Sequence, residues 1–295
     1  MIHTSSMRLT GPLSLVVSLA VFPSICAASS QPEQLGDPLP ETIQKGDLVV
    51  GTEEFVRVPQ TSDSSEGGQT NPAYARIQYL VPVGDGSSRL ALNDLRGPLY
   101  LTDERGRTPA VFLDLRDENV GFDDSMFPNE TGLVSVAFHP QFGQVGTPGF
   151  GKFYTAYSAG SDTGIADYLE NDAASHESVI REWTATDPSA NVFSGTSREV
   201  FRIGQFAPNH NIGTIAFNPH AEVGSADYGL LYACLGDGGA AHDPRDYGQS
   251  LAVPQAAIIR IDPLEADGTK GYGVPPDNPF VGTDGAAPEI WAYGL

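Results

Sequence analysis

The sequence is poor in cysteine and in basic residues. Only Cys26 and Cys234 are cysteine among its 295 residues, and 16 Lys and Arg stand against 37 Asp and Glu, for a formal net charge of −21. Proteins that bind nucleic acid need clustered cations for the phosphate backbone, so we expect no nucleic-acid partner. The acidity is interpreted as solubility in a salty or extracellular medium, with cation binding by some carboxylates as the alternative.

Long apolar runs are also scarce, and the one near the N-terminus has the layout of a secretory signal. The apolar stretch 11–22 follows Arg8 and precedes small residues around Cys26. It is shorter than the about 20 residues of a spanning helix. We therefore expect a signal peptide at 1–28, a secreted or periplasmic protein and no stable membrane span, and bulky Ile25 disfavours a lipid anchor on Cys26.

Without that segment Cys234 is the only thiol, which excludes an intramolecular disulfide. It lies in the apolar run 230–235, which predicts a buried structural cysteine. Trp291 and Tyr293 alternate along a β-type run, and core packing is their expected role.

Convincing helical periodicity is absent as well, while Gly (33) and Pro (23) are both frequent, as tight turns between short strands require. Residues 29–75 read as a linker with one strand, 47–58, that would close a ring of sheets. Four-stranded units then follow, and residues 289–293 would open a fourth unit. The expected strands are 77–80, 89–93, 98–102 and 110–115, then 133–138, 152–157, 179–184 and 198–203, and a third unit from Gly213 that includes 257–261.

Three apolar landmarks recur in order at one shared interval. Ala137-Phe138-His139-Pro140 returns 79 residues later as Ala216-Phe217-Asn218-Pro219, Phe153-Tyr154 returns after 78 as Leu231-Tyr232, and Val179-Ile180-Arg181 returns after 79 as Ile258-Ile259-Arg260. Recurring short-stranded modules of this length are typical of β-propeller blades. The sequence therefore predicts an all-β propeller.

Several motifs follow one another in the last third of the chain. They are His210-Asn211-Ile212-Gly213, Leu235-Gly236-Asp237-Gly238-Gly239, Val274-Pro275-Pro276-Asp277-Asn278-Pro279-Phe280 and Pro288-Glu289-Ile290-Trp291-Ala292-Tyr293-Gly294-Leu295. These motifs resemble those of the soluble quinoprotein (PQQ-dependent) glucose/sorbosone dehydrogenase family. The resemblance covers about residues 76–295 and implies a six-bladed β-propeller, of which roughly the N-terminal half, about three blades plus one strand, is present. We accordingly expect the chain to be a truncated part that is inactive on its own.

The resemblance implies a site around His210. Oxidising a hydroxyl requires a proton to leave oxygen while hydride leaves carbon, and a neutral imidazole is suited to accept that proton. Asp237 matches the carboxylate that orients this histidine, and a plain turn aspartate is the alternative. Glu130 and Asn209 match positions near the substrate, with a surface loop as the alternative for Glu130. Ile212 and Thr214 depart from the family's usual residues there.

The family uses PQQ and calcium, but we expect most ligands of both to come after Leu295 and no metal site within this chain. PQQ is a tricarboxylate, so a chain of this charge should bind it weakly. The expected function is PQQ-dependent oxidation of a sugar or other alcohol to a lactone or carbonyl, with electrons passing to an external acceptor. The alternatives are a non-catalytic extracellular binding propeller and a metal-dependent sugar lactonase.

Overall fold

The computed structural model describes residues 46, 51–61, 75–125, 130–169, 174–266 and 268–294. The chain divides into two compact units, 1–52 and 53–295, and the description below concerns the second. The expected signal peptide at 1–28 lies outside the described residues. No helix in the described part of the chain has the length and hydropathy needed to cross a membrane.

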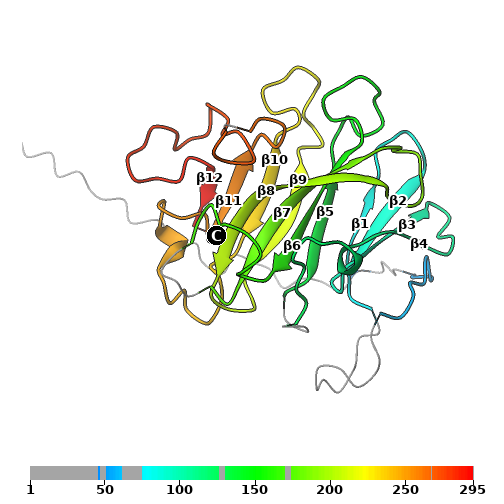
Figure 1. Ribbon diagram of the computed structural model, residues 1–295, viewed down its shortest axis with the longest axis horizontal. Coiled ribbons are helices and arrows are strands. Elements are labelled where there is room, and N and C mark those ends of the chain that lie inside the picture. Colours follow the sequence, from blue (N-terminus) through cyan, green and yellow to red (C-terminus); the bar gives the residue numbers. More distant parts are fainter. Residues whose placement is uncertain are drawn as a thin grey trace, which may run out of the picture. The chain divides into compact units, whose positions relative to one another are not determined.

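The second unit is built from three four-stranded antiparallel sheets, which lie side by side in Figure 1. Sheet 1 contains the strands β1 (Ile77–Pro82), β2 (Arg89–Asp94), β3 (Pro98–Asp103) and β4 (Ala110–Asp114), in that order. All four were predicted from alternating apolar residues between turn signals such as Gly84-Asp85-Gly86, where both glycines have positive φ. The short 3-10 helix η2 (Leu115–Asp117) follows β4.

Sheet 2 has the same order, with β5 (Leu133–Phe138), β6 (Lys152–Ala159), β7 (His176–Ala185) and β8 (Gly195–Gln205). Its last two strands are longer than predicted because β7 and β8 form a hairpin paired along nearly their full length. The extra residues are mostly polar, so apolar alternation alone did not reveal them.

Sheet 3 contains β9 (Ile212–Phe217), β10 (Leu231–Leu235), β11 (Ala257–Ile261) and β12 (Ile290–Tyr293), with the short 3-10 helix η3 (Tyr247–Gln249) between β10 and β11. The prediction that 289–293 opens a fourth unit is wrong: Ala257 of β11 pairs with Tyr293, so β12 completes the third sheet. The long connection 262–289 separates two paired strands and gave the appearance of a boundary between units. The described residues therefore form three complete four-stranded sheets, with β12 in the third.

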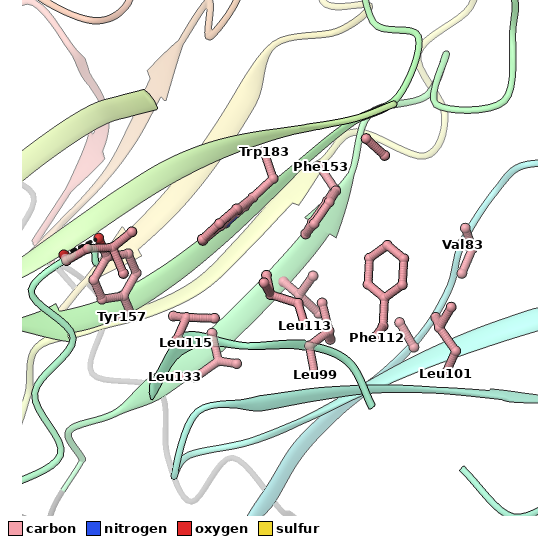
Figure 2. Close-up of a cluster of buried hydrophobic side chains, with 14 of the residues drawn as sticks. Val83, Leu99, Leu101, Phe112, Leu113, Leu115, Leu133, Phe153, Tyr157 and Trp183 are labelled. Atoms are coloured by element: carbon pink, nitrogen blue, oxygen red, sulfur yellow. Dashed lines mark hydrogen bonds between the residues drawn. The ribbon is translucent and has the colours of Figure 1, made fainter. Parts of the chain in front are cut away.

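The sheets pack face to face, and the first strand of each lies nearest the others: β5 contacts both β1 and β9. One core cluster fills the space between sheets 1 and 2, where Leu99, Leu101 and Phe112 face Phe153 and Trp183 (Figure 2). A second cluster fills the space between sheets 2 and 3. This arrangement confirms the predicted all-β, propeller-type fold.

An ion-pair cluster within sheet 2 is hydrogen-bonded to the connection that follows β11. The Glu182 carboxylate, only 3% exposed, accepts hydrogen bonds from Lys152, Tyr154 and Arg198. Arg198 also donates to the carbonyl oxygens of Pro263 and Gly271, which belong to the connection after β11. Burial would raise the pKa of Glu182, but the bonds from Arg198 and Lys152 outweigh burial and hold it below its usual value.

The strand pairing corrects the interval at which the third apolar landmark, Val179-Ile180-Arg181, recurs. Tyr154 lies opposite Glu182 in sheet 2, and Tyr232 lies opposite Arg260 in sheet 3. Arg260 therefore occupies the place of Glu182, 78 residues earlier, and not that of Arg181. The register shifts between Ile180 and Arg181 and between Ile258 and Ile259 are also 78 residues apart, which agrees with this alignment.

Three residues expected in the core lie instead on the face of sheet 3 that points away from sheet 2. Cys234 is exposed, and the side chains of Trp291 and Tyr293 are 38% and 43% exposed. Ala156, which occupies the place of Cys234 in sheet 2, is fully buried because sheet 3 covers it. No fourth sheet covers the outer face of sheet 3 among the described residues, so the prediction of burial was wrong for all three.

The strand expected at 47–58 is also not observed over its described part, because residues 51–58 belong to no strand. The chain there runs against sheet 1 without joining its ladder. A Cβ placed on Gly106 would lie 1.8 Å from the carbonyl oxygen of Phe55, and Thr61 donates to the Asp94 carboxylate at 2.5 Å. A glycine at position 106 permits this approach of the two backbones.

Candidate functional site

His210 and Asp237 meet at one end of sheet 3. His210 precedes β9 and Asp237 follows β10, and Leu235 at the end of β10 pairs with Ile212 at the start of β9. Because the two strands are antiparallel, the loops that carry these residues emerge side by side. The Nδ1 of His210 lies 2.8 Å from Oδ1 of Asp237. The structure thus brings together the pair predicted from the sequence.

The glycine-rich turn 236–239 supports this contact through its backbone. The N–H of Gly238 donates to the carbonyl oxygen of His210 at 2.9 Å, and the N–H of Gly239 donates to Oδ1 of Asp237 at 3.0 Å. His210 has a φ of 53°, in the left-handed region that few non-glycine residues adopt. Such backbone strain is held only where the surroundings fix it, and these hydrogen bonds provide that support.

Glu130, which precedes β5 of sheet 2, is hydrogen-bonded to the same loop. Its Oε2 accepts the backbone N–H of His210 at 2.7 Å, and its own N–H donates to the carbonyl oxygen of Pro208 at 3.2 Å. The side chain is exposed, so the carboxylate both holds the His210 loop and faces solvent. A role in contacting substrate remains a prediction.

Asn209 lies behind the glycine-rich turn. A Cβ placed on Gly239, whose φ is 105°, would lie 2.5 Å from Oδ1 of Asn209. The Asn209 side chain therefore packs against the backbone of the turn, and a glycine at 239 is what makes room for it. Its expected contact with substrate also remains a prediction.

A cavity of about 210 Å³ opens beside Glu130. Its walls come from all three sheets, since β1, β5 and β9 each contribute residues. Sequence reasoning singled out Glu130 and the motif residues 211–213 among them, whereas the lining residues from 76 to 95 and Val134 belong to no motif. The lining residues are Arg76, Gln78, Tyr79, Leu95, Glu130, Val134, Asn211, Ile212 and Gly213.

The geometry suits proton transfer. The side chain of His210 is 45% exposed and that of Asp237 is 19% exposed, so the imidazole is accessible while its partner is mostly covered. A neutral imidazole whose Nδ1–H is donated to a carboxylate keeps Nε2 as an acceptor. The pair can therefore orient an imidazole that takes a proton from a bound hydroxyl.

The described residues around His210 do not fit PQQ by themselves. Two carboxylates, Glu130 and Asp237, flank the histidine, and Arg76 is the one cationic side chain that lines the cavity within the described residues. A tricarboxylate would meet more negative than positive charge there. For calcium, the described ranges contain no group of three or more His, Cys, Asp or Glu side chains placed to hold a metal ion.

Comparison with known proteins gives one family and several relatives. The family model for glucose/sorbosone dehydrogenase matches residues 89–295. HIPL1 protein of Arabidopsis thaliana is 30% identical over 254 residues, which are 73% of this chain and 34% of the relative. Hedgehog-interacting protein of Mus musculus is 26% identical over 220 residues, 73% of this chain and 28% of the relative. The chain thus spans about a third of the length of these relatives.

Two solved structures are also similar. One is described as a putative oxidoreductase (glucose dehydrogenase) from Thermus thermophilus, with 23% identity and a TM-score of 0.49 over 73% of this chain and 50% of that one. The other is described as a glucose dehydrogenase, with 19% identity and a TM-score of 0.48 over 70% of this chain and 52% of that one.

Proposed function

This chain belongs to the glucose/sorbosone dehydrogenase family, and from that premise we propose that it supplies the proton acceptor for oxidation of a sugar or other alcohol. His210 takes the hydroxyl proton, Asp237 holds the imidazole and favours the cation that forms, and the carbon is oxidised to a lactone or carbonyl. The proposal includes a secreted or periplasmic location and an external electron acceptor.

The 2.8 Å contact between His210 and Asp237 is the observation that carries this proposal. A histidine needs such a partner to serve as a base with a fixed tautomer, whereas a solvated turn residue does not. The pair itself does not line the cavity, but the cavity is lined by Glu130, which hydrogen-bonds the His210 backbone, and by Asn211, so it gives a hydroxylated ligand a place near that pair.

The family's cofactor is assigned a limited role. PQQ, when bound, would accept the hydride, but the described residues leave its carboxylates poorly compensated, and no step is derived through it. The proposal for the 295-residue chain itself is weak PQQ binding and little turnover. Fluorescence titration with PQQ measures the first of these, and saturation at low micromolar PQQ would contradict it.

The proposed activity is tested by dye reduction with PQQ, calcium and a panel of sugars and alcohols, on this chain and on the longest gene product that contains it. His210→Ala should lower the rate in the longer product by at least about a hundredfold. The matched control is His220→Ala, because His220 is an exposed turn residue that should leave the rate unchanged. A rate that is the same in both variants would overturn the assignment of His210.

A second candidate function is binding without catalysis. It is favoured by the relatives from Mus musculus and Homo sapiens that carry the name Hedgehog-interacting protein. In that case the loops around His210 would present a surface to a secreted protein. This candidate would be supported if no sugar raised the rate of dye reduction above the rate without sugar and such a protein showed saturable binding.

A further inference from the structure

The cavity beside Glu130 has one side of fixed shape. Leu95, Val134 and Ile212 line it and are only 2%, 8% and 4% exposed. All three belong to the core cluster between sheets 2 and 3. Because packed interior side chains cannot move far without opening voids, a ligand must adapt to this side of the cavity.

The rest of the lining includes one aromatic ring, that of Tyr79, which reaches from one sheet to another. Tyr79 lies on β1 and is half buried, and its hydroxyl is hydrogen-bonded to Oγ1 of Thr214 on β9. Figure 1 shows β1 and β9 on either side of β5. The bond therefore spans the first strands of sheets 1 and 3 and holds the ring in place as a wall of the cavity.

The size and polarity of the cavity restrict what it can hold. Its volume of about 210 Å³ is below the roughly 300–1,000 Å³ of sites for drug-sized ligands. Arg76, Gln78, Glu130 and Asn211 bring a guanidinium, a carboxylate and two amides to the lining, beside the apolar side chains of Leu95, Val134 and Ile212. These groups suit a ligand with several hydroxyls and an apolar face, such as one sugar ring or a short polyol.

We infer that Tyr79, held by Thr214, is the specificity-determining residue of this site: it limits the cavity to a monosaccharide or short polyol and excludes longer saccharides. The inference rests on the proposed function, because it takes the ligand of this cavity to be the molecule that His210 acts on. It assigns a role to β1, which no motif in the sequence singled out.

The test measures binding without PQQ, so it does not depend on turnover. Isothermal titration with glucose, sorbitol and maltose is carried out on the full 295-residue chain and on Tyr79→Ala, Tyr79→Phe and Thr214→Val. The control is Tyr228→Ala, which removes a half-buried tyrosine from the connection between β9 and β10, away from the cavity. Circular dichroism verifies the fold of each variant.

The wild-type chain should bind glucose and sorbitol at least about tenfold more tightly than maltose, which is equivalent to about 1.4 kcal/mol. Tyr79→Ala should reduce that preference to about twofold, while Tyr79→Phe and Thr214→Val should fall between, and Tyr228→Ala should match wild type. Equal binding of the three ligands by wild type, no binding of any, or an unchanged preference in both Tyr79→Ala and Thr214→Val would overturn the inference.

The two proposals fail in different ways. If the size preference is found but His210→Ala oxidises sugars as fast as wild type, the cavity is a saccharide site and the assignment of His210 fails alone. If oxidation depends on His210 but the chain shows no size preference, the role of Tyr79 fails alone.

Discussion

His210 and Asp237 are joined by a 2.8 Å contact between Nδ1 and Oδ1, although 27 residues separate them in the chain. The same Oδ1 also accepts the backbone N–H of Gly239 at 3.0 Å. One carboxylate oxygen therefore holds both the imidazole of His210 and the turn 236–239 that carries the carboxylate. Asp237 is thus the residue through which the geometry of the site can be tested.

The first prediction separates the charge of Asp237 from its role in the turn. Asp237→Asn keeps an oxygen that can accept the Gly239 N–H but removes the negative charge, so it should lower kcat about 10- to 100-fold with little change in stability. Asp237→Ala loses both and should also lower the melting temperature. Steady-state kinetics on the longest gene product that contains this chain, and thermal melts, compare both variants with Asp284→Asn, an exposed control. Equal melting temperatures for the two Asp237 variants would contradict the turn's dependence on this oxygen.

The second prediction concerns the close approach of Gly236 to the histidine. A Cβ at this position would lie 2.5 Å from the carbonyl oxygen of His210, so Gly236→Ala should displace the His210 backbone and cost about 1–3 kcal/mol of unfolding free energy. Gly213→Ala is the matched control, because its nearest contact would be an ordinary 3.7 Å. Urea unfolding measures the stability of both variants. Equal urea midpoints would show that the turn accommodates the added Cβ without loss of stability.

The third prediction is a loss of stability in mild acid. Burial lowers the pKa of His139 and of His176 to about 4, from an ordinary value of 6.5. Between pH 6.5 and 4 the unfolded chain therefore binds more protons than the folded chain. The free energy of unfolding must then decrease as the pH is lowered through that window. The loss should be about 2 kcal/mol per histidine at pH 5. Urea midpoints at pH 7, 6 and 5 test this, and a constant midpoint would show that these histidines are not held neutral.

The fourth prediction addresses the ion pairs of Glu182 within sheet 2. Glu182→Ala leaves Arg198 and Lys152 without their buried acceptor and should cost about 3–5 kcal/mol. Glu54→Ala breaks an ion pair with Arg57 whose side chains are 64% and 80% exposed, so its effect on stability should be much smaller. Denaturant unfolding of both variants provides the comparison, and a similar small loss in each would mean that the buried pair is not a structural link.

Most strands were predictable because apolar alternation and turn residues are local signals. β5 and β11 match their predicted bounds, and all of sheet 1 lies within one or two residues of expectation. The assignment of β12 failed because pairing across the connection 262–289 leaves no local trace. The exposure of Cys234 could not be predicted either, since burial depends on whether another sheet covers that face.

The site was predictable only in part, and through family resemblance. Motifs indicated His210 and Asp237, and the pairing of β9 with β10 explains why they meet. The cavity could not be predicted from the sequence, because Tyr79, Val134 and Ile212 come from three different sheets. Their proximity is a property of how the sheets pack, which short motifs do not encode.

Chemical rescue of His210→Ala by free imidazole tests the central claim most directly. If His210 accepts the hydroxyl proton, the variant should lose at least about a hundredfold in oxidation rate, and added imidazole should restore part of it in proportion to the neutral imidazole present. The experiment uses the longest gene product that contains this chain, with His220→Ala as control. An unimpaired His210→Ala variant, or a loss that imidazole does not relieve at any pH, would contradict the account.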